Sequence, residues 1–98
     1  MFGIFYKPEA LEDISDACEW YNAQQSGLGE RFLDELDDVL DYLEMNPYLS
    51  RKHFGNIHEA TMKIFPFVVI YKIEAKQVIV FSVFNCHQNP NKIKKIIK

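Results

Sequence analysis

The sequence predicts an α+β domain, β-α-α-β-β-β in order, in which a helical hairpin packs on a small, mainly antiparallel, curved sheet. Apolar residues recur over residues 8–45 with the 3.6-residue period of amphipathic helices. From residue 57 onward the period shortens to the two residues of a strand, and Asn46-Pro47 separates the two patterns. A chain of 98 residues, 48% of them hydrophobic, suffices for one core, so residues 1–98 are expected to form a single domain.

The first half of the chain is predicted to form one strand and two helices. Gly3 to Lys7 is a run of strand-forming residues, and Pro8 then begins a helix, because proline has no N–H to leave unpaired in the first turn. Gln25-Ser26-Gly27 ends this helix, and a second helix runs from Leu28 to Asn46-Pro47. The positions expected to face the core are spaced three or four apart: Leu11, Ile14, Cys18, Tyr21, Leu28, Phe32, Leu36, Val39 and Leu43.

The second half is predicted to form three strands, after a loop from Tyr48 to Gly55. Residues 57–64 alternate as in a half-buried strand, whereas 67–73 and 78–84 are apolar on both faces. Such central strands need helices on one face and a partner or the chain's own tail on the other. Residues 74–77 contain no glycine, so we expect a connection of about four residues rather than a tight turn.

Composition excludes several classes of protein. The longest apolar run, residues 64–71, is less than half as long as a membrane span requires, and the N-terminus lacks the pattern of a signal peptide. We therefore expect a cytoplasmic protein with no membrane partner. The two cysteines, Cys18 and Cys86, lie far apart without a CxxC spacing, which favours reduced thiols over a disulfide framework. Neither a metal site nor a cofactor is expected.

Charge is distributed very unequally along the chain. Residues 1–50 contain two basic and twelve acidic side chains (−10), and residues 51–98 contain nine basic and two acidic ones (+7). One interpretation is that the basic half attracts phosphates or an acidic partner protein. The other is that an acidic helical layer simply attracts a basic sheet edge. The acidic residues are expected to keep the outer helix faces in solvent: Glu9, Asp13, Asp16, Asp34, Asp37, Asp38 and Asp41.

Several short sequence motifs occur in an order that is typical of one protein superfamily. Pro8 to Ile14 opens the first helix, Trp20-Tyr21 and Gly27 to Leu33 span the helical turn, Phe65-Pro66-Phe67 enters a strand, and Val83 to Pro90 ends the last one. In this order and spacing the chain resembles the RelE/ParE superfamily of toxins from bacterial type II toxin-antitoxin systems.

The resemblance implies a growth-inhibiting toxin that a cognate antitoxin neutralises. Members similar to ParE, which include plasmid stabilisation proteins, are taken to act on DNA gyrase and have no nuclease chemistry assigned. Members similar to RelE cut mRNA in the ribosome without a metal. A third possibility is a degenerate, non-toxic member retained as an interaction domain.

The residues present favour the ParE-like alternative. RNA cleavage needs a base, an acid and cations on the phosphate, and relatives that cleave mRNA supply these mostly from arginines and lysines. Here the arginines are only Arg31 and Arg51. If the chain is a nuclease, we expect His58, Lys63 and His87 to be catalytic. The side chains expected to contact the target or its phosphates are polar or basic: Lys52, Gln88, Lys92, Lys94 and Lys95.

Each of these histidines also has a purely structural interpretation. His58 fits a strand histidine that is hydrogen-bonded to a neighbouring carbonyl, and His87 fits an exposed loop residue. Lys63 is five residues from His58, so on a regular strand the two side chains would point to opposite faces. The sequence alone leaves these alternatives open.

Overall fold

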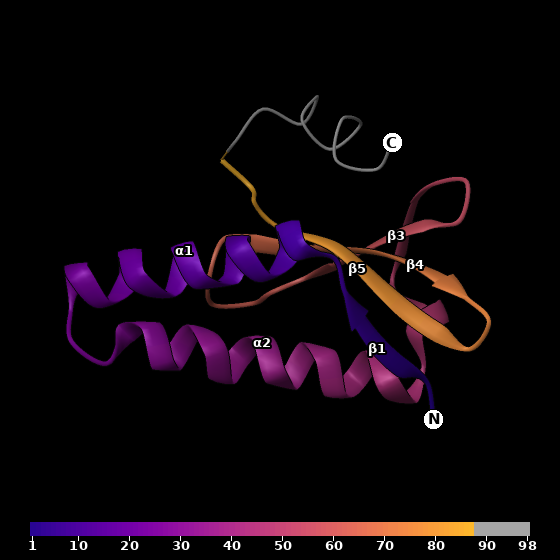
Figure 1. The fold of residues 1–98 in the computed structure, drawn as a ribbon, viewed down its shortest axis with the longest axis horizontal. Coiled ribbons are helices and arrows are strands. Elements are labelled where there is room, and N and C mark those ends of the chain that lie inside the picture. The colour runs from indigo at the N-terminus through magenta and orange to yellow at the C-terminus, as the bar shows by residue number, and fades with distance from the viewer. Residues whose placement is uncertain (88–98) are drawn as a thin grey trace.

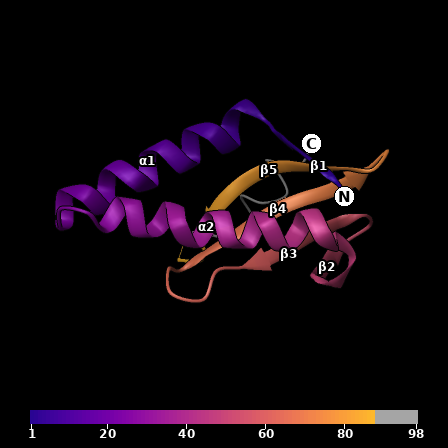
Figure 2. The same ribbon diagram turned by 90° about the horizontal axis from the view of Figure 1, so that it is seen from below.

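Two helices lie side by side on one face of a five-stranded sheet (Figures 1 and 2). The structure is a computed structural model that describes residues 1–87, apart from the side chains of His53 and Phe54. Its elements are β1 (Gly3–Tyr6), α1 (Pro8–Gln24), α2 (Leu28–Met45), the short 3-10 helix η1 (Pro47–Leu49), β2 (Arg51–Phe54), β3 (Ile57–Thr61), β4 (Phe67–Glu74) and β5 (Gln77–Asn85). The strand order is β1-β5-β4-β3-β2, with β1 parallel to β5 and the other pairs antiparallel. The predicted fold class is confirmed.

Neither helix formed by residues 1–87 combines the length and the apolar content that crossing a membrane demands. Both cysteines are free thiols; Cys18 is half-buried and Cys86 exposed.

The turn between the helices depends on two glycines. Gly27 has φ of 88°, which suits glycine because it has no Cβ, and it lets the chain reverse. Gly29 lies so close to α1 that an added Cβ would be 2.5 Å from the Cys18 carbonyl oxygen. The Gly29 N–H donates to Oδ1 of Asn22 at 2.8 Å. The backbone of α2 therefore lies against both the backbone and a side chain of α1 at this end.

The predicted buried face of α1 is confirmed in part, since Ile14 and Tyr21 pack, half-buried, against the core. Ala10 and Ala17 are buried, whereas Leu11, expected in the core, is 54% exposed. Ala10 and Ala17 therefore lie on the face of α1 that is turned to the core, and Leu11 lies outside it. On α2 the predicted face is largely confirmed, since Phe32, Leu36 and Leu43 are buried.

An aromatic cluster joins the helical hairpin to the sheet. The Phe32 ring centroid lies 5.1 Å from that of Phe67 and 5.4 Å from that of Phe65, both nearly edge-to-face. Tyr21 of α1 completes the cluster, 4.8 Å from Phe65 and 5.6 Å from Phe32. These distances fall in the range at which ring pairs attract beyond the effect of burial alone.

The central strands bury apolar side chains on both faces, as predicted. Val69, Tyr71, Val78 and Val80 belong to the core under the helices. A second buried cluster consists of residues that alternate with these along the strands: Ile57, Val68, Ile70, Phe81 and Phe84.

Three local predictions were wrong. Residues 48–55 are not a plain loop, because they form η1 and β2, and the latter pairs with β3 through a turn at Gly55. The strand predicted over 57–64 ends at Thr61. The connection at 74–77 is a two-residue turn, since Glu74 pairs with Gln77 while Ala75 and Lys76 adopt φ of 51° and 61°. The twist of the flanking strands favours this turn even without glycine.

Asp13 of α1 closes a gap at the edge of β5. Strand β1 pairs with β5 only as far as Val80, and the register of β5 against β4 slips between Ile70 and Tyr71. One carboxylate oxygen of Asp13 accepts hydrogen bonds from the Ser82 hydroxyl at 2.6 Å and the Val83 N–H at 3.2 Å. Burial raises the pKa of Asp13, although these two hydrogen bonds oppose the increase. The prediction that Asp13 merely faces solvent was wrong.

Asp13→Asn is expected to change how stability depends on pH. Both hydrogen bonds use one oxygen, so the amide oxygen can accept both, while the buried charge is removed. Because the folded pKa of Asp13 is raised, its contribution to stability is complete below its ordinary value of 3.8 and is lost as pH rises through the folded pKa. As pH rises from 3.8 through the folded pKa of Asp13, the wild type should therefore lose stability relative to Asp13→Asn. Urea unfolding at a series of pH values from acid to neutral measures this difference.

Asp13→Ala serves as the comparison, since it loses both hydrogen bonds at every pH and should cost about 1–3 kcal/mol. A difference between wild type and Asp13→Asn that stays constant with pH would contradict this description of Asp13.

Candidate functional site

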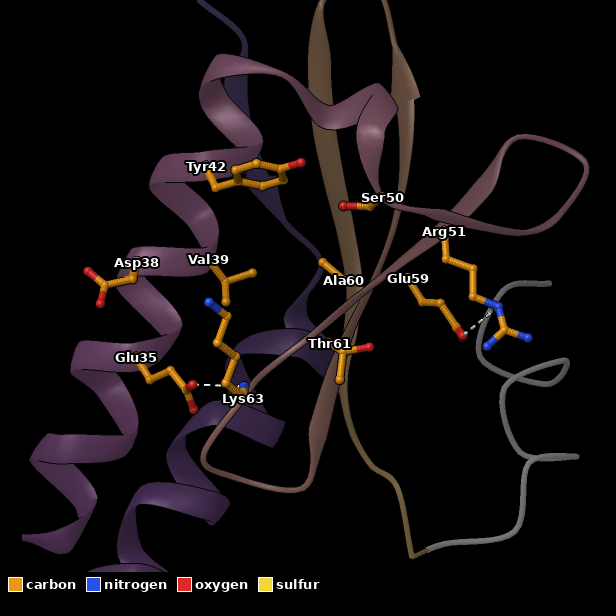
Figure 3. A pocket seen from close by; sticks show the side chains of 10 residues that line it. All are labelled: Glu35, Asp38, Val39, Tyr42, Ser50, Arg51, Glu59, Ala60, Thr61 and Lys63. Atoms are coloured by element: carbon orange, nitrogen blue, oxygen red, sulfur yellow. Dashed lines mark hydrogen bonds and ion pairs between the residues drawn. The ribbon is translucent and has the colours of Figure 1, made fainter.

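A groove separates α2 from the edge of the sheet formed by β2 and β3 (Figure 3). Its volume is about 470 Å³, within the range of pockets that bind small ligands or a few side chains. The groove is lined by side chains of α2, the η1–β2 junction, β3 and the β3–β4 turn: Glu35, Asp38, Val39, Tyr42, Ser50, Arg51, Glu59, Ala60, Thr61 and Lys63.

Glu35 shapes the lower end of the groove as drawn in Figure 3. Its carboxylate accepts the backbone N–H groups of Lys63 at 2.8 Å, Ile64 at 2.9 Å and Phe65 at 3.2 Å. Three successive N–H groups can point at one anion only when the chain curls around it, so β3 cannot continue past Thr61. Glu35 therefore ties α2 to the β3–β4 turn and sets the distance between them.

The charged side chains of the groove lie on different walls. Arg51 and Glu59, paired across β2 and β3, form an ion pair of 3.7 Å in which the Arg51 side chain is 81% exposed and that of Glu59 only 14%. Asp38 of α2 is exposed at the rim of the groove. The Lys63 side chain runs from the turn along α2 toward Val39 (Figure 3).

His58 occupies a structural position in the described part of the chain. Its ring is buried, stacks on Tyr71 with centroids 5.4 Å apart, and places Nδ1 3.3 Å from the Ser50 carbonyl oxygen. Burial raises the pKa of the Tyr71 hydroxyl, which stays protonated at neutral pH and donates to the Pro47 carbonyl at 2.6 Å. The two rings thus hold η1 and the start of β2 against the sheet.

Lys63 and His87 lie at the other end of the sheet from His58. Both are exposed, Lys63 in the β3–β4 turn and His87 just after β5. These segments adjoin, because the Cys86 N–H donates to the Pro66 carbonyl at 2.8 Å. The structure brings Lys63 and His87 to the same end, while Lys52 is opposite His58 in β2 and exposed.

The predicted site residues are therefore not gathered into one cluster. The other predicted contact residues, Gln88, Lys92, Lys94 and Lys95, lie outside the residues that the structure describes. Within residues 1–87 no group of three His, Cys, Asp or Glu side chains has an arrangement that could hold a metal ion. The catalytic roles of His58, Lys63 and His87 stay predictions.

Glu35 and Asp38 were not predicted as site residues. Helical phase places Glu35 between the core positions Phe32 and Leu36 and the outer face, which marks it as half-buried but not as a ligand of a distant turn. No sequence signal identifies the three N–H groups that it binds.

Residues 4–90 match the model of the family described as the ParE toxin of the type II toxin-antitoxin system parDE. The chain belongs to the ParE toxin family. The predicted membership of the RelE/ParE superfamily is thereby confirmed. A search of curated proteins found no match.

Solved structures of toxin-antitoxin systems share the fold of this ParE-family chain. The chromosomal ParDE system from P. aeruginosa is 14% identical with a TM-score of 0.66, over 87% of this chain and 96% of that one. The intact E. coli RelBE toxin-antitoxin complex is 14% identical with a TM-score of 0.68, over 90% and 100%. The heterotetrameric YoeB-YefM complex from Staphylococcus aureus is 14% identical with a TM-score of 0.61, over 86% and 95%. At this identity the likeness shows the fold alone.

Glu35→Ala should destabilise the domain, because three N–H groups of the β3–β4 turn lose their anionic acceptor. The expected loss is about 1.5–3 kcal/mol, the range for hydrogen bonds to a charged group. Urea unfolding measures the loss, and amide exchange at residues 63–65 should accelerate.

Asp34→Ala is the matched control, since Asp34 is an exposed carboxylate on the same helix. Its effect should stay within about 0.5 kcal/mol, as for most surface substitutions. Equal effects of the two substitutions would show that the turn does not depend on Glu35.

Proposed function

We propose that this chain is the toxin of a type II toxin-antitoxin pair in the cytoplasm, and that a cognate antitoxin neutralises it by direct binding. It inhibits growth by binding its target, and the ParE resemblance points to DNA gyrase. The observation that carries this proposal is the match of residues 4–90 to the ParE toxin family. Solved relatives of the same fold include the intact RelBE and the YoeB-YefM toxin-antitoxin complexes, which supports an antitoxin as partner.

The positions of the ionisable groups support binding rather than RNA cleavage. A metal-free nuclease needs a base, an acid and cations around one phosphate. In the described part of the chain the His58 ring is buried and faces the Ser50 carbonyl, and Lys63 and His87 lie at the other end of the sheet. Arg51 is paired with Glu59, and a lysine cannot reproduce the two-pronged contact of an arginine with phosphate.

A ribosome-dependent mRNA endonuclease is the second candidate. One observation favours it: Lys63 and His87 are both exposed at the same end of the sheet, where a cation and a titratable imidazole could act on one phosphate. The third candidate, a non-toxic interaction domain, predicts no growth defect at all.

The Lys63→Ala, His87→Ala double variant separates these candidates without disturbing the buried His58. We expect induced wild type and double variant to inhibit growth equally, to reduce supercoiling by gyrase, and to leave transcripts intact. The reason is that neither side chain performs chemistry on RNA in the proposed function. Co-expression of the protein encoded by the neighbouring reading frame should restore growth.

Transcript cleavage by the wild type that the double variant lacks would replace this proposal with the endonuclease. Normal growth on induction of the wild type would instead support the non-toxic domain.

A further inference from the structure

The edge of β3 is open where it borders the groove. In an antiparallel pair, alternate residues direct their N–H and C=O groups to opposite sides of the strand. The Met62 N–H donates to the Phe67 carbonyl at 2.9 Å, on the side of β4. By alternation, the N–H and C=O groups of Ala60 also point to β4, whereas those of Thr61 point to the opposite side of β3. On that side β2 begins with Arg51 opposite Glu59. No described residue is in register with Thr61 there, and its N–H and C=O can pair with another chain.

The side chains that line the groove beside this edge include both apolar and acidic ones. Val39 and Tyr42 of α2, with Ala60 of β3, give the groove an apolar floor. Asp38 adds an exposed carboxylate at the rim, and the residues described by the structure include no ion-pair partner for it. The other two acids of the groove are already engaged, Glu35 by three N–H groups and Glu59 by Arg51.

The spacing of these features matches an extended peptide. If a residue of an incoming strand pairs with Thr61, the side chains of its two sequence neighbours point toward α2. Those two neighbours are about 6.6 Å apart along the strand. Asp38 and Tyr42 are one helical turn apart, about 6 Å along the helix axis. One neighbour can therefore contact Val39 and Tyr42 while the other reaches Asp38.

We propose that the groove binds an extended segment of the cognate antitoxin through three contacts. Its backbone pairs with Thr61, an apolar side chain packs on Val39 and Tyr42, and a lysine or arginine two residues away pairs with Asp38. Lys63 lies beside α2 near Val39 and is exposed, so binding of this cation requires the Lys63 side chain to move aside. The inference rests on the proposed function, because it names the surface and the chemistry by which the antitoxin binds.

Two variants of the intact toxin test the charge contact, with the purified protein from the neighbouring reading frame as the probe. Asp38→Lys should weaken binding about tenfold or more, because it replaces an attractive charge by a repulsive one. Asp37→Lys makes the same change on the adjacent, exposed residue that does not line the groove, and it should alter affinity by less than about twofold. Calorimetric titration gives both affinities.

Amide hydrogen exchange of the complex tests the backbone contact. The Thr61 N–H should exchange rapidly in the free toxin and become protected on binding, whereas that of Ala60 is protected in both states. A bound partner that leaves Thr61 exchange unchanged, with Asp38→Lys binding as well as Asp37→Lys, overturns the inference while the proposed function stands. A neighbouring protein that neither binds nor restores growth overturns both.

Discussion

The packing of Phe32 against Phe65 and Phe67 is the contact on which the rest of the structure depends. Each ring pair adds about 0.5–1.5 kcal/mol beyond burial, and truncating a buried phenylalanine to alanine typically costs about 3–5 kcal/mol. A domain has only about 5–15 kcal/mol of net stability, so this one side chain accounts for a large share. It also fixes α2 relative to the point where the chain enters β4. From that position, Glu35 one turn further along α2 reaches the β3–β4 turn, and the groove beside β3 acquires a rigid wall.

Two helical carboxylates complete the sheet where its own strands end. Asp13 supplies the acceptor that β1 does not provide beyond Val80, and Glu35 binds the N–H groups that follow the last residue of β3. Each carboxylate accepts hydrogen bonds from N–H or O–H groups that would otherwise need water. Asp13 thereby ties α1, and Glu35 ties α2, to the strands by charge-assisted hydrogen bonds in addition to packing. Thr61 lies two residues before the first N–H group that Glu35 binds, and Met62 between them bonds to Phe67 of β4. The contact that ends β3 therefore leaves Thr61 without a strand partner on the outer edge among residues 1–87.

Helical periodicity predicted α1 and α2 and most of their buried faces, because the pattern of an amphipathic helix depends only on residues three and four positions apart. The pattern missed the outward turn of Leu11, since a helix of small residues can rotate toward the sheet by an amount that only packing determines. The strand β2 was missed because Arg51 and Lys52 are polar and the segment has four residues, too few to show an alternation. Asp13 was assigned to solvent, and no role was predicted for Glu35, because helical phase considers each helix apart from the strands that it packs against. Their partners, at residues 82–83 and 63–65, are distant in sequence, and the contacts exist only once the layers are assembled. A carbonyl as hydrogen-bond partner of His58 was one of the two interpretations of this residue, but the sequence did not indicate that Ser50, between η1 and β2, supplies it.

A double-mutant cycle between Phe32 and Phe67 tests whether these rings hold the helical hairpin on the sheet. The free energy of unfolding is measured for Phe32→Leu, Phe67→Leu, the double variant and the wild type, since leucine keeps the positions apolar while removing the ring pair. We expect the effects of the two substitutions not to be additive, with a coupling free energy of at least about 0.5 kcal/mol. Additive effects, with no coupling between the two positions, would show that the ring pair does not hold the hairpin on the sheet.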